Sequence, residues 1–255
     1  MSEGLSRRDL LKAAGLGGAA AVIPGVSQAQ VPVEPVVNPV AEGLAGAANP
    51  TPVGLLFFFN DEEAQFVEAA VERLIPSDPE WPGAGQAGVL YYIDRQLASA
   101  YGAGGRMYLN GPWDPSAPPQ FGYQLRQSPA ELYRIGIAET RQFARDQFNQ
   151  REVWDLGPAD MDRVLEALEF GDAALPSIPS PVFFETLLAN TIEGYFGDPA
   201  YGGNRDMVGW RMVGFPGAYA AYIDAIDNYG VAFERRPISF ADQQARHDHI
   251  HGHGH

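Results

Sequence analysis

The residue types that most often carry enzyme chemistry are unevenly distributed in this chain of 255 residues, because all of its histidines lie in the last nine residues, HDHIHGHGH. The rest of the chain has no histidine for a Ser-His-Asp triad, a general base or the Glu-x-x-His pairs of di-iron helix bundles. In an extended tail the alternating histidines would lie on one side and could bind Zn²⁺, Ni²⁺ or Cu²⁺. A purification tag is the alternative origin. The weak candidate metal ligands are His247, His249, His251, His253 and His255.

Carboxylates are the next residues that could support catalysis. Glu185 and Glu193 are eight residues apart on one expected helix, which places them on nearly the same face, about 12 Å apart by the helical rise. That separation is too wide for the pair of a retaining glycosidase and wide even for an inverting one. We therefore interpret both as surface charges.

No glycine or acidic motif in the sequence matches a cofactor or ion site. GAGGR at residues 102–106 lacks the G-x-G-x-x-G pattern after a strand that a dinucleotide requires. DPAYG at residues 198–202 fails as a calcium loop, because its third and fifth positions lack oxygen side chains. The absence of cysteine excludes disulfides, iron–sulfur clusters and covalent c-type haem. We therefore predict no cofactor in this chain.

Charge and size narrow the class of protein further. The formal net charge is −15, from 17 Lys+Arg and 32 Asp+Glu, whereas nucleic acid or an anionic membrane surface would require a basic face. With 45% hydrophobic residues, the chain can bury one substantial core. We expect an acidic protein with one domain and no nucleic-acid partner.

The N-terminus has the pattern of a twin-arginine (Tat) export signal. The motif SRRDLLK at residues 6–12, which contains Arg7 and Arg8, precedes a mildly apolar run and a cleavage-like SQA at residues 27–29. The alternatives are a short amphipathic helix or a membrane anchor, but the run has only about half of the ~20 apolar residues that a spanning helix needs. We assign residues 1–29 to the signal and expect export through the Tat translocase to the periplasm.

Behind the leader, residues 30–54 repeat proline without helical periodicity, which predicts an extended arm. Residues 55–240 carry helical signals, and the His-rich tail occupies residues 241–255. Because no strand-like alternation competes, we predict an all-α fold, a single helical domain of about six helices with long ordered loops. The expected helices cover residues 60–75, 86–101, 128–149, 158–170, 180–195, 204–214 and 217–229.

Two helix starts and one loop carry the clearest local signals. Asn60 can cap the first helix, and Ser128 precedes a proline and a glutamate in the order of a capping box. Residues 102–127 have no regular pattern. Loops of such length are commonly functional or bound to something.

The stretch EGYFGDPAYGGNRDMVGW, residues 193–210, concentrates special backbone chemistry where no reaction is apparent. Gly202 and Gly203 can adopt positive φ or let another backbone come close. Asn204 is expected to cap a short helix, and Asp206 near that helix start suits the helix dipole. The residues therefore predict a rigid corner between two helices.

Some side chains of this corner are expected to face a partner. We expect Trp210 to lock the corner internally, with Tyr201, Asn204 and Arg205 available to another protein. The alternative is a corner that only packs its own aromatic residues. The candidate partner-binding or structural residues are Asp198, Tyr201, Gly202, Gly203, Asn204, Arg205, Asp206 and Trp210.

The same residues carry a resemblance to a known family. Over roughly residues 55–230 the chain resembles the gluconate 2-dehydrogenase subunit 3 family, and the twin-arginine leader fits that family too. The matching segments are RLIPSD at residues 73–78, Gly88, Ile93-Asp94, EGYF at residues 193–196, GDPAYGGNRDMVGW at residues 197–210, which is the most specific, and GFPG at residues 214–217.

The resemblance implies a small, non-catalytic subunit of a periplasmic dehydrogenase complex. In that family the large subunit is a flavoprotein of the glucose–methanol–choline (GMC) oxidoreductase type, which binds FAD and oxidises a sugar, sugar acid or polyol. A multihaem cytochrome c subunit passes the electrons to the membrane. The small subunit supplies the Tat signal for a large subunit that lacks one, and helps it mature and stay assembled. The resemblance therefore implies FAD and haem c in partner chains, association with the membrane through the complex, and no catalytic residue in this chain.

Two other classes of function stay open at this point. One is a free-standing periplasmic helical protein that binds a ligand, or an enzyme that uses carboxylates and aromatic side chains in a cleft. The other is a metal-handling protein that acts through the histidines of residues 247–255.

Overall fold

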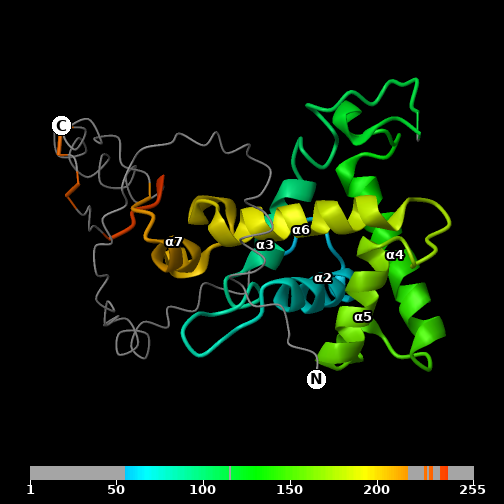
Figure 1. Ribbon diagram of the computed structural model, residues 1–255, viewed down its shortest axis with the longest axis horizontal. Helices are drawn as coiled ribbons and strands as arrows, with labels where there is room; N and C mark the ends of the chain where they lie inside the picture. Colours follow the sequence, from blue (N-terminus) through cyan, green and yellow to red (C-terminus); the bar gives the residue numbers. More distant parts are fainter. Residues whose placement is uncertain (1–54, 115, 218–226, 229, 232–235, 241–255) are drawn as a thin grey trace, which may run out of the picture. The chain divides into compact units, whose positions relative to one another are not determined.

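The computed structural model in Figure 1 describes residues 55–114, 116–217, 227–228, 230–231 and 236–240. All of them belong to the second of two compact units, residues 53–255. The described part forms no strand, and Gly217 and Ile238 make an isolated parallel bridge. The prediction of an all-α fold is therefore confirmed. The elements are α2 (Asp61–Leu74), α3 (Val89–Leu97), η1 (Pro119–Phe121), α4 (Pro129–Gln147), η2 (Val153–Asp155), α5 (Pro158–Glu169), α6 (Ser180–Phe196), η3 (Pro199–Tyr201), η4 (Arg205–Met207) and α7 (Val208–Val213).

Helix α6 is the central element of this unit. It packs against α2, α3, α4, α5 and α7, and Figure 1 shows it, in yellow, running between the other helices. Phe183, Leu187 and Tyr195 on this helix are fully buried, and burial of such side chains is the main favourable term in folding. None of the described helices combines the length and the apolar character needed to cross a membrane.

The best-marked helix starts have the expected geometry. At α2, Asn60 Oδ1 accepts a hydrogen bond from Glu63 N at 2.9 Å, and Glu63 Oε2 accepts one from Asn60 N at 3.0 Å. At α4, Ser128 and Glu131 form the same reciprocal pair. Each capping box satisfies backbone donors that a helix start leaves without partners.

Helix α3 is shorter than predicted. It begins at Val89, not at residue 86, because Gly88 before it has φ = 77°, outside the helical region. It ends at Leu97. Just beyond this end, the Ser99 hydroxyl donates to Gln96 O at 2.7 Å and accepts from Tyr101 N at 3.2 Å, and these bonds stabilise a turn. The helix expected over residues 217–229 lies almost entirely outside the described residues.

A buried carboxylate fastens the start of the domain to α3. Asp94 is 0% exposed, and it accepts hydrogen bonds from three consecutive backbone N–H groups. Its Oδ2 accepts from Phe57 N at 2.7 Å, and its Oδ1 accepts from Phe58 N at 3.0 Å and Phe59 N at 2.9 Å. Three such donors compensate the cost of removing a negative charge from water.

Arg134 of α4 holds the same segment from the other side. Its guanidinium forms an ion pair with Glu63, donates to the carbonyl oxygen of Phe58 and lies 4.0 Å from the centroid of the Phe58 ring. The capping residue Glu63 therefore has two roles, at the start of α2 and in the contact with α4. These contacts join the first described residues to three helices.

We expect Asp94→Asn to destabilise the domain by about 1–3 kcal/mol, because either Phe57 N or the pair Phe58 N and Phe59 N would face an amide NH₂ group in place of a carboxylate oxygen. Urea unfolding followed by circular dichroism would measure the change. Asp172→Asn is the matched control, since Asp172 is exposed and lies outside this network. Equal unfolding midpoints for the two variants would contradict the anchoring role of Asp94.

Candidate functional site

The chain turns sharply after α6, and we call residues 197–217 the corner. Asp198 caps the short helix η3, because its Oδ1 accepts a hydrogen bond from Ala200 N at 2.9 Å. Its other oxygen, Oδ2, accepts from Phe240 N at 2.8 Å. One carboxylate therefore fixes the start of the corner and holds a later part of the chain beside it.

The paired glycines of the corner have different structural tasks. Gly202 has φ = 111°, a conformation that L side chains rarely adopt. Gly203 packs directly against the backbone of Gly194 in α6, and a Cβ built at Gly203 would overlap the carbonyl oxygen of Gly194. The GG pair of the sequence is thus required by one turn and by one contact between two backbones.

Asn204 is an internal brace. Its side chain is 0% exposed. Its Nδ2 donates to Gly197 O at 2.7 Å, and its Oδ1 accepts from Gly209 N at 2.8 Å. The expectation that Asn204 is available to a partner is wrong, because both polar ends of its side chain are used within the corner. It makes no side-chain cap at η4, and it accepts instead from a backbone N–H in the first turn of α7.

The helix expected over residues 204–214 is interrupted. Asn204, Asp206 and Met207 all have left-handed backbones, with φ of 47°, 57° and 56°, so η4 is followed by a separate α7. Non-glycine residues in this region are uncommon and are held there by the surrounding structure. Asp206 is exposed and lies near a helix start, as expected, just before the residue that caps α7; the expectation of one continuous helix over residues 204–214 is wrong.

Trp210 closes the corner from within. It is buried, its Nε1 donates to Phe196 O at 2.6 Å, and its ring meets the ring of Phe215 edge-on at a centroid distance of 5.2 Å. The indole therefore donates to a carbonyl at the end of α6 while its ring packs against Phe215. This arrangement joins both helices that flank the turn.

Tyr201 and Arg205 are more exposed than Asn204. Tyr201 is 58% exposed. Arg205 is half-buried, its backbone N donates to Ala87 O at 2.9 Å, and its guanidinium lies close enough to α2 to lower the pKa of Glu68. A role for either side chain in binding a partner stays a prediction.

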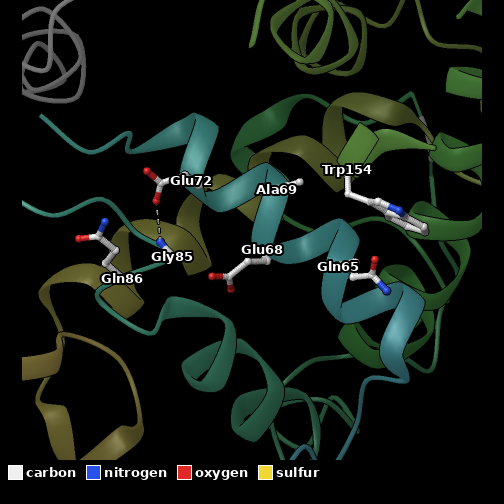
Figure 2. Close-up of a pocket in the computed structure, with 7 residues that line it drawn as sticks. All are labelled: Gln65, Glu68, Ala69, Glu72, Gly85, Gln86 and Trp154. Carbon is white, nitrogen blue, oxygen red and sulfur yellow. Dashed lines mark hydrogen bonds between the residues drawn. The ribbon is translucent and has the colours of Figure 1, made fainter. Parts of the chain in front are cut away.

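An open hollow of about 450 Å³ lies beside α2 (Figure 2). Figure 2 shows the carboxylate of Glu68 pointing into the space between α2 and the loop that carries Gly85. Glu72 is committed to that loop, because it accepts from Gly85 N at 3.1 Å and from the backbone N and hydroxyl of Ser77 at 2.9 and 2.7 Å. The lining residues are Gln65, Glu68, Ala69, Glu72, Gly85, Gln86 and Trp154.

Glu68 is the electrostatically unusual residue of the hollow. The residue is exposed on α2, but the protein around its carboxylate displaces water and raises its pKa above the ordinary 4.5. The negative charge of Glu72 raises the pKa further, and Arg205 opposes both effects. The residues that line the hollow include no nucleophile beside a general base. The sequence did not predict this hollow, because in the sequence Glu68 and Glu72 are simply polar positions of an amphipathic helix.

The sequence also did not predict a polar network that joins α3, α4 and α6. The hydroxyl of the fully buried Tyr133 donates to Asn190 Oδ1 at 2.9 Å, and Asn190 Nδ2 donates to Glu193 Oε2 at 3.2 Å. The hydroxyl of Tyr92 donates to the same Glu193 oxygen at 3.2 Å. Burial raises the pKa of Tyr133 well above its ordinary 10.0, so its phenol stays a neutral donor. The signal in the sequence was an asparagine within the apolar stripe of α6.

The two carboxylates considered from the sequence therefore differ. Glu185 and Glu193 are both exposed, but Glu193 is tied to Tyr92 and Asn190. The other candidates are not placed, because Arg7, Arg8 and the histidines of residues 247–255 lie outside the described residues. Within the described ranges, no group of three His, Asp or Glu residues is arranged to hold a metal ion.

Two family models match parts of the chain. A family model described as gluconate 2-dehydrogenase subunit 3 matches residues 61–217, from the start of α2 to the end of the corner. A second model, described as the twin-arginine translocation pathway signal sequence, matches residues 4–24. No curated protein and no solved structure matches the chain.

We expect Gly203→Ala to destabilise the domain by about 1–3 kcal/mol, because the added methyl group has to displace the backbone of Gly194. A larger valine should prevent folding or assembly. Gly157→Ala is the matched control, since a Cβ there meets nothing within 4 Å and the backbone φ is −71°. Thermal unfolding of both variants measures the difference, and an unchanged midpoint for Gly203→Ala would rule out the close contact.

We expect Glu68→Gln to raise the unfolding midpoint at about pH 7. The folded-state pKa of Glu68 is raised, so the stability that protonated Glu68 contributes is present below its unfolded pKa and is lost as the pH rises through the folded pKa. The amide removes that loss, and the two proteins should converge near pH 3. Glu185→Gln is the control, because Glu185 is an exposed carboxylate on the surface of α6. Urea titrations at several pH values test the prediction, which fails if the gap is constant with pH.

Proposed function

Because the chain belongs to the gluconate 2-dehydrogenase subunit 3 family, we propose that it is a non-catalytic small subunit of a periplasmic FAD-dependent dehydrogenase complex. The observation that carries the proposal is the presence in one chain of a twin-arginine signal over residues 4–24 and the family domain over residues 61–217. Such a subunit supplies the export signal for a flavoprotein large subunit without one, and supports the maturation and stability of that subunit.

The geometry of the corner supports a role through shape. The backbone of the corner is joined to the backbone at the end of α6 by the most distinctive residues of the sequence, Gly203, Asn204 and Trp210. Buried polar groups that are fully hydrogen-bonded make a structure rigid and specific. A rigid surface suits a subunit that has to hold a larger partner in one conformation during and after export.

The cofactors of the proposed complex belong to partner chains. FAD is bound by the GMC-type large subunit, where the sugar, sugar acid or polyol is oxidised, and haem c by a multihaem cytochrome c subunit that passes electrons to the membrane. The complex reaches the membrane through that association. In this arrangement the substrate does not contact the small subunit, and its identity is decided by residues of the large one.

Co-expression with the neighbouring large subunit tests the proposal. Affinity capture of this chain from the periplasm should recover a yellow complex that contains FAD. Changing Arg7 and Arg8 to lysine should leave both subunits in the cytoplasm, because the translocase reads the paired arginines.

Recovery of a colourless chain alone, or unchanged export of the large subunit with the lysine variant, would contradict the proposal. A preparation free of FAD that binds or turns over a sugar acid would instead favour a free-standing binding protein or enzyme. Deletion of residues 241–255 separates the metal-handling alternative, since the proposed complex should keep its activity without the tail.

A further inference from the structure

The connection between α3 and α4 is long, and neither the packing of the helices nor the structure of the corner gives it a role. We call residues 98–128 the lobe; its regular structure in the described residues is the single turn η1. Figure 1 shows it, in green, extending from the ends of α3 and α4 outside the packed helices. Long connections of this kind inside a compact domain are uncommon and are commonly functional.

The lobe has a defined shape that its own residues maintain. Near its tip, Asp114 Oδ1 accepts from the backbone N and the hydroxyl of Ser116 at 2.9 and 2.6 Å. Gln124 accepts from Asp114 N at 3.3 Å and donates to Phe121 O at 3.1 Å, which links the outgoing and returning chains. A loop that is ordered before binding loses less conformational entropy when a partner arrives.

Two aromatic rings of the lobe face solvent. Tyr108 is 74% exposed and Phe121 is 72% exposed. The hydroxyl of Tyr108 donates to Gly111 O at 3.0 Å, so its ring is held outward in a fixed position. Exposed, pre-positioned aromatic side chains are typical of the residues that dominate binding energy at protein interfaces.

The charge of the lobe is opposite to that of the rest of the protein. Its charged residues are Arg106, Asp114 and Arg126, a net charge of +1 from two arginines and one aspartate, whereas the whole chain carries −15 and the remainder therefore −16. Arg106 is exposed and has no hydrogen bond or ion pair among the described residues. Arg126 lies over the Trp113 ring at 5.5 Å. An acidic partner surface would be attracted to the lobe and repelled by the rest of this chain.

The corner is less suited to the same role. Its polar side chains at Asn204 and Trp210 are used internally. Its exposed rings, Tyr201 at 58% and Phe215 at 45%, are less exposed than the two rings of the lobe. Tyr108 and Phe121 of the lobe therefore present more aromatic surface to a partner than the corner does.

We propose that the lobe is the docking element for the flavoprotein partner, and that Tyr108 and Phe121 enter an apolar recess of that partner whose rim is acidic. The inference rests on the proposed function, because the partner named is the large subunit of that complex. It assigns the contact to residues 98–128 and not to the signature residues of the corner. Arg106 faces the acidic rim and contributes to the orientation of the two subunits.

The test uses the complete co-expressed complex, with dissociation on dilution followed by mass photometry. The double variant Tyr108→Ala/Phe121→Ala should raise the dissociation constant at least about tenfold. Phe170→Ala is the matched control, since Phe170 is 71% exposed at the end of α5, and it should leave the constant unchanged. Arg106→Glu should weaken the complex at low salt and reduce its salt dependence.

A second measurement covers the case in which the double variant fails to fold. Hydrogen exchange of the wild-type chain should show added protection over residues 106–123 when the large subunit is bound. Equal dissociation constants for all variants, or protection only elsewhere, would overturn the lobe as docking element and leave the proposed function standing. Absence of any complex with the wild-type chain would overturn both. Self-association through the lobe, or binding of the lobe to vesicles of anionic phospholipid, with unchanged flavoprotein binding would also overturn the proposal.

Discussion

The structure depends first on a negative charge that is completely withdrawn from water. The carboxylate of Asp94 is stable in the interior only because three backbone N–H groups of residues 57–59 point at it. This requirement fixes the path of the chain immediately before Asn60, which in turn places the capping box at the start of α2. Through Glu63 the same contacts reach Arg134 in α4. One buried charge thus sets the relative position of three helices.

The second constraint is close approach around the end of α6. Gly194 lets Tyr92 and Val89 of α3 pack against α6, and its backbone also meets Gly203 of the corner. Side chains larger than hydrogen at these positions would separate the elements. With the helices this close, Asn204 and Trp210 can reach the carbonyl groups at the end of α6. The conspicuous sequence of the corner is therefore explained largely by packing and by hydrogen bonding between neighbouring segments.

The sequence predicted those parts of the fold that local rules decide. Asn60, and Ser128 with Glu131, marked helix starts correctly, because a capping box involves only residues three positions apart. The start of α3 and the break at Asp206 were missed, because both follow from left-handed backbones at Gly88, Asp206 and Met207 that the local helical pattern did not indicate. Asp94 and Asn190 read as ordinary polar residues on helices, since their partners are distant in sequence. The corner was located from its glycines, but Asn204 was wrongly expected to face outward because its burial depends on α6 and α7.

The attachment of residues 57–59 also has a mechanical consequence. Tension applied to the chain ahead of Phe57 passes to α3 through Asp94 and to α4 through the contact of Arg134 with Phe58. Several bonds to one short segment share a load, whereas a single terminal contact would open one bond at a time. A pull on the chain ahead of Phe57 would therefore load α3 and α4 together with α2.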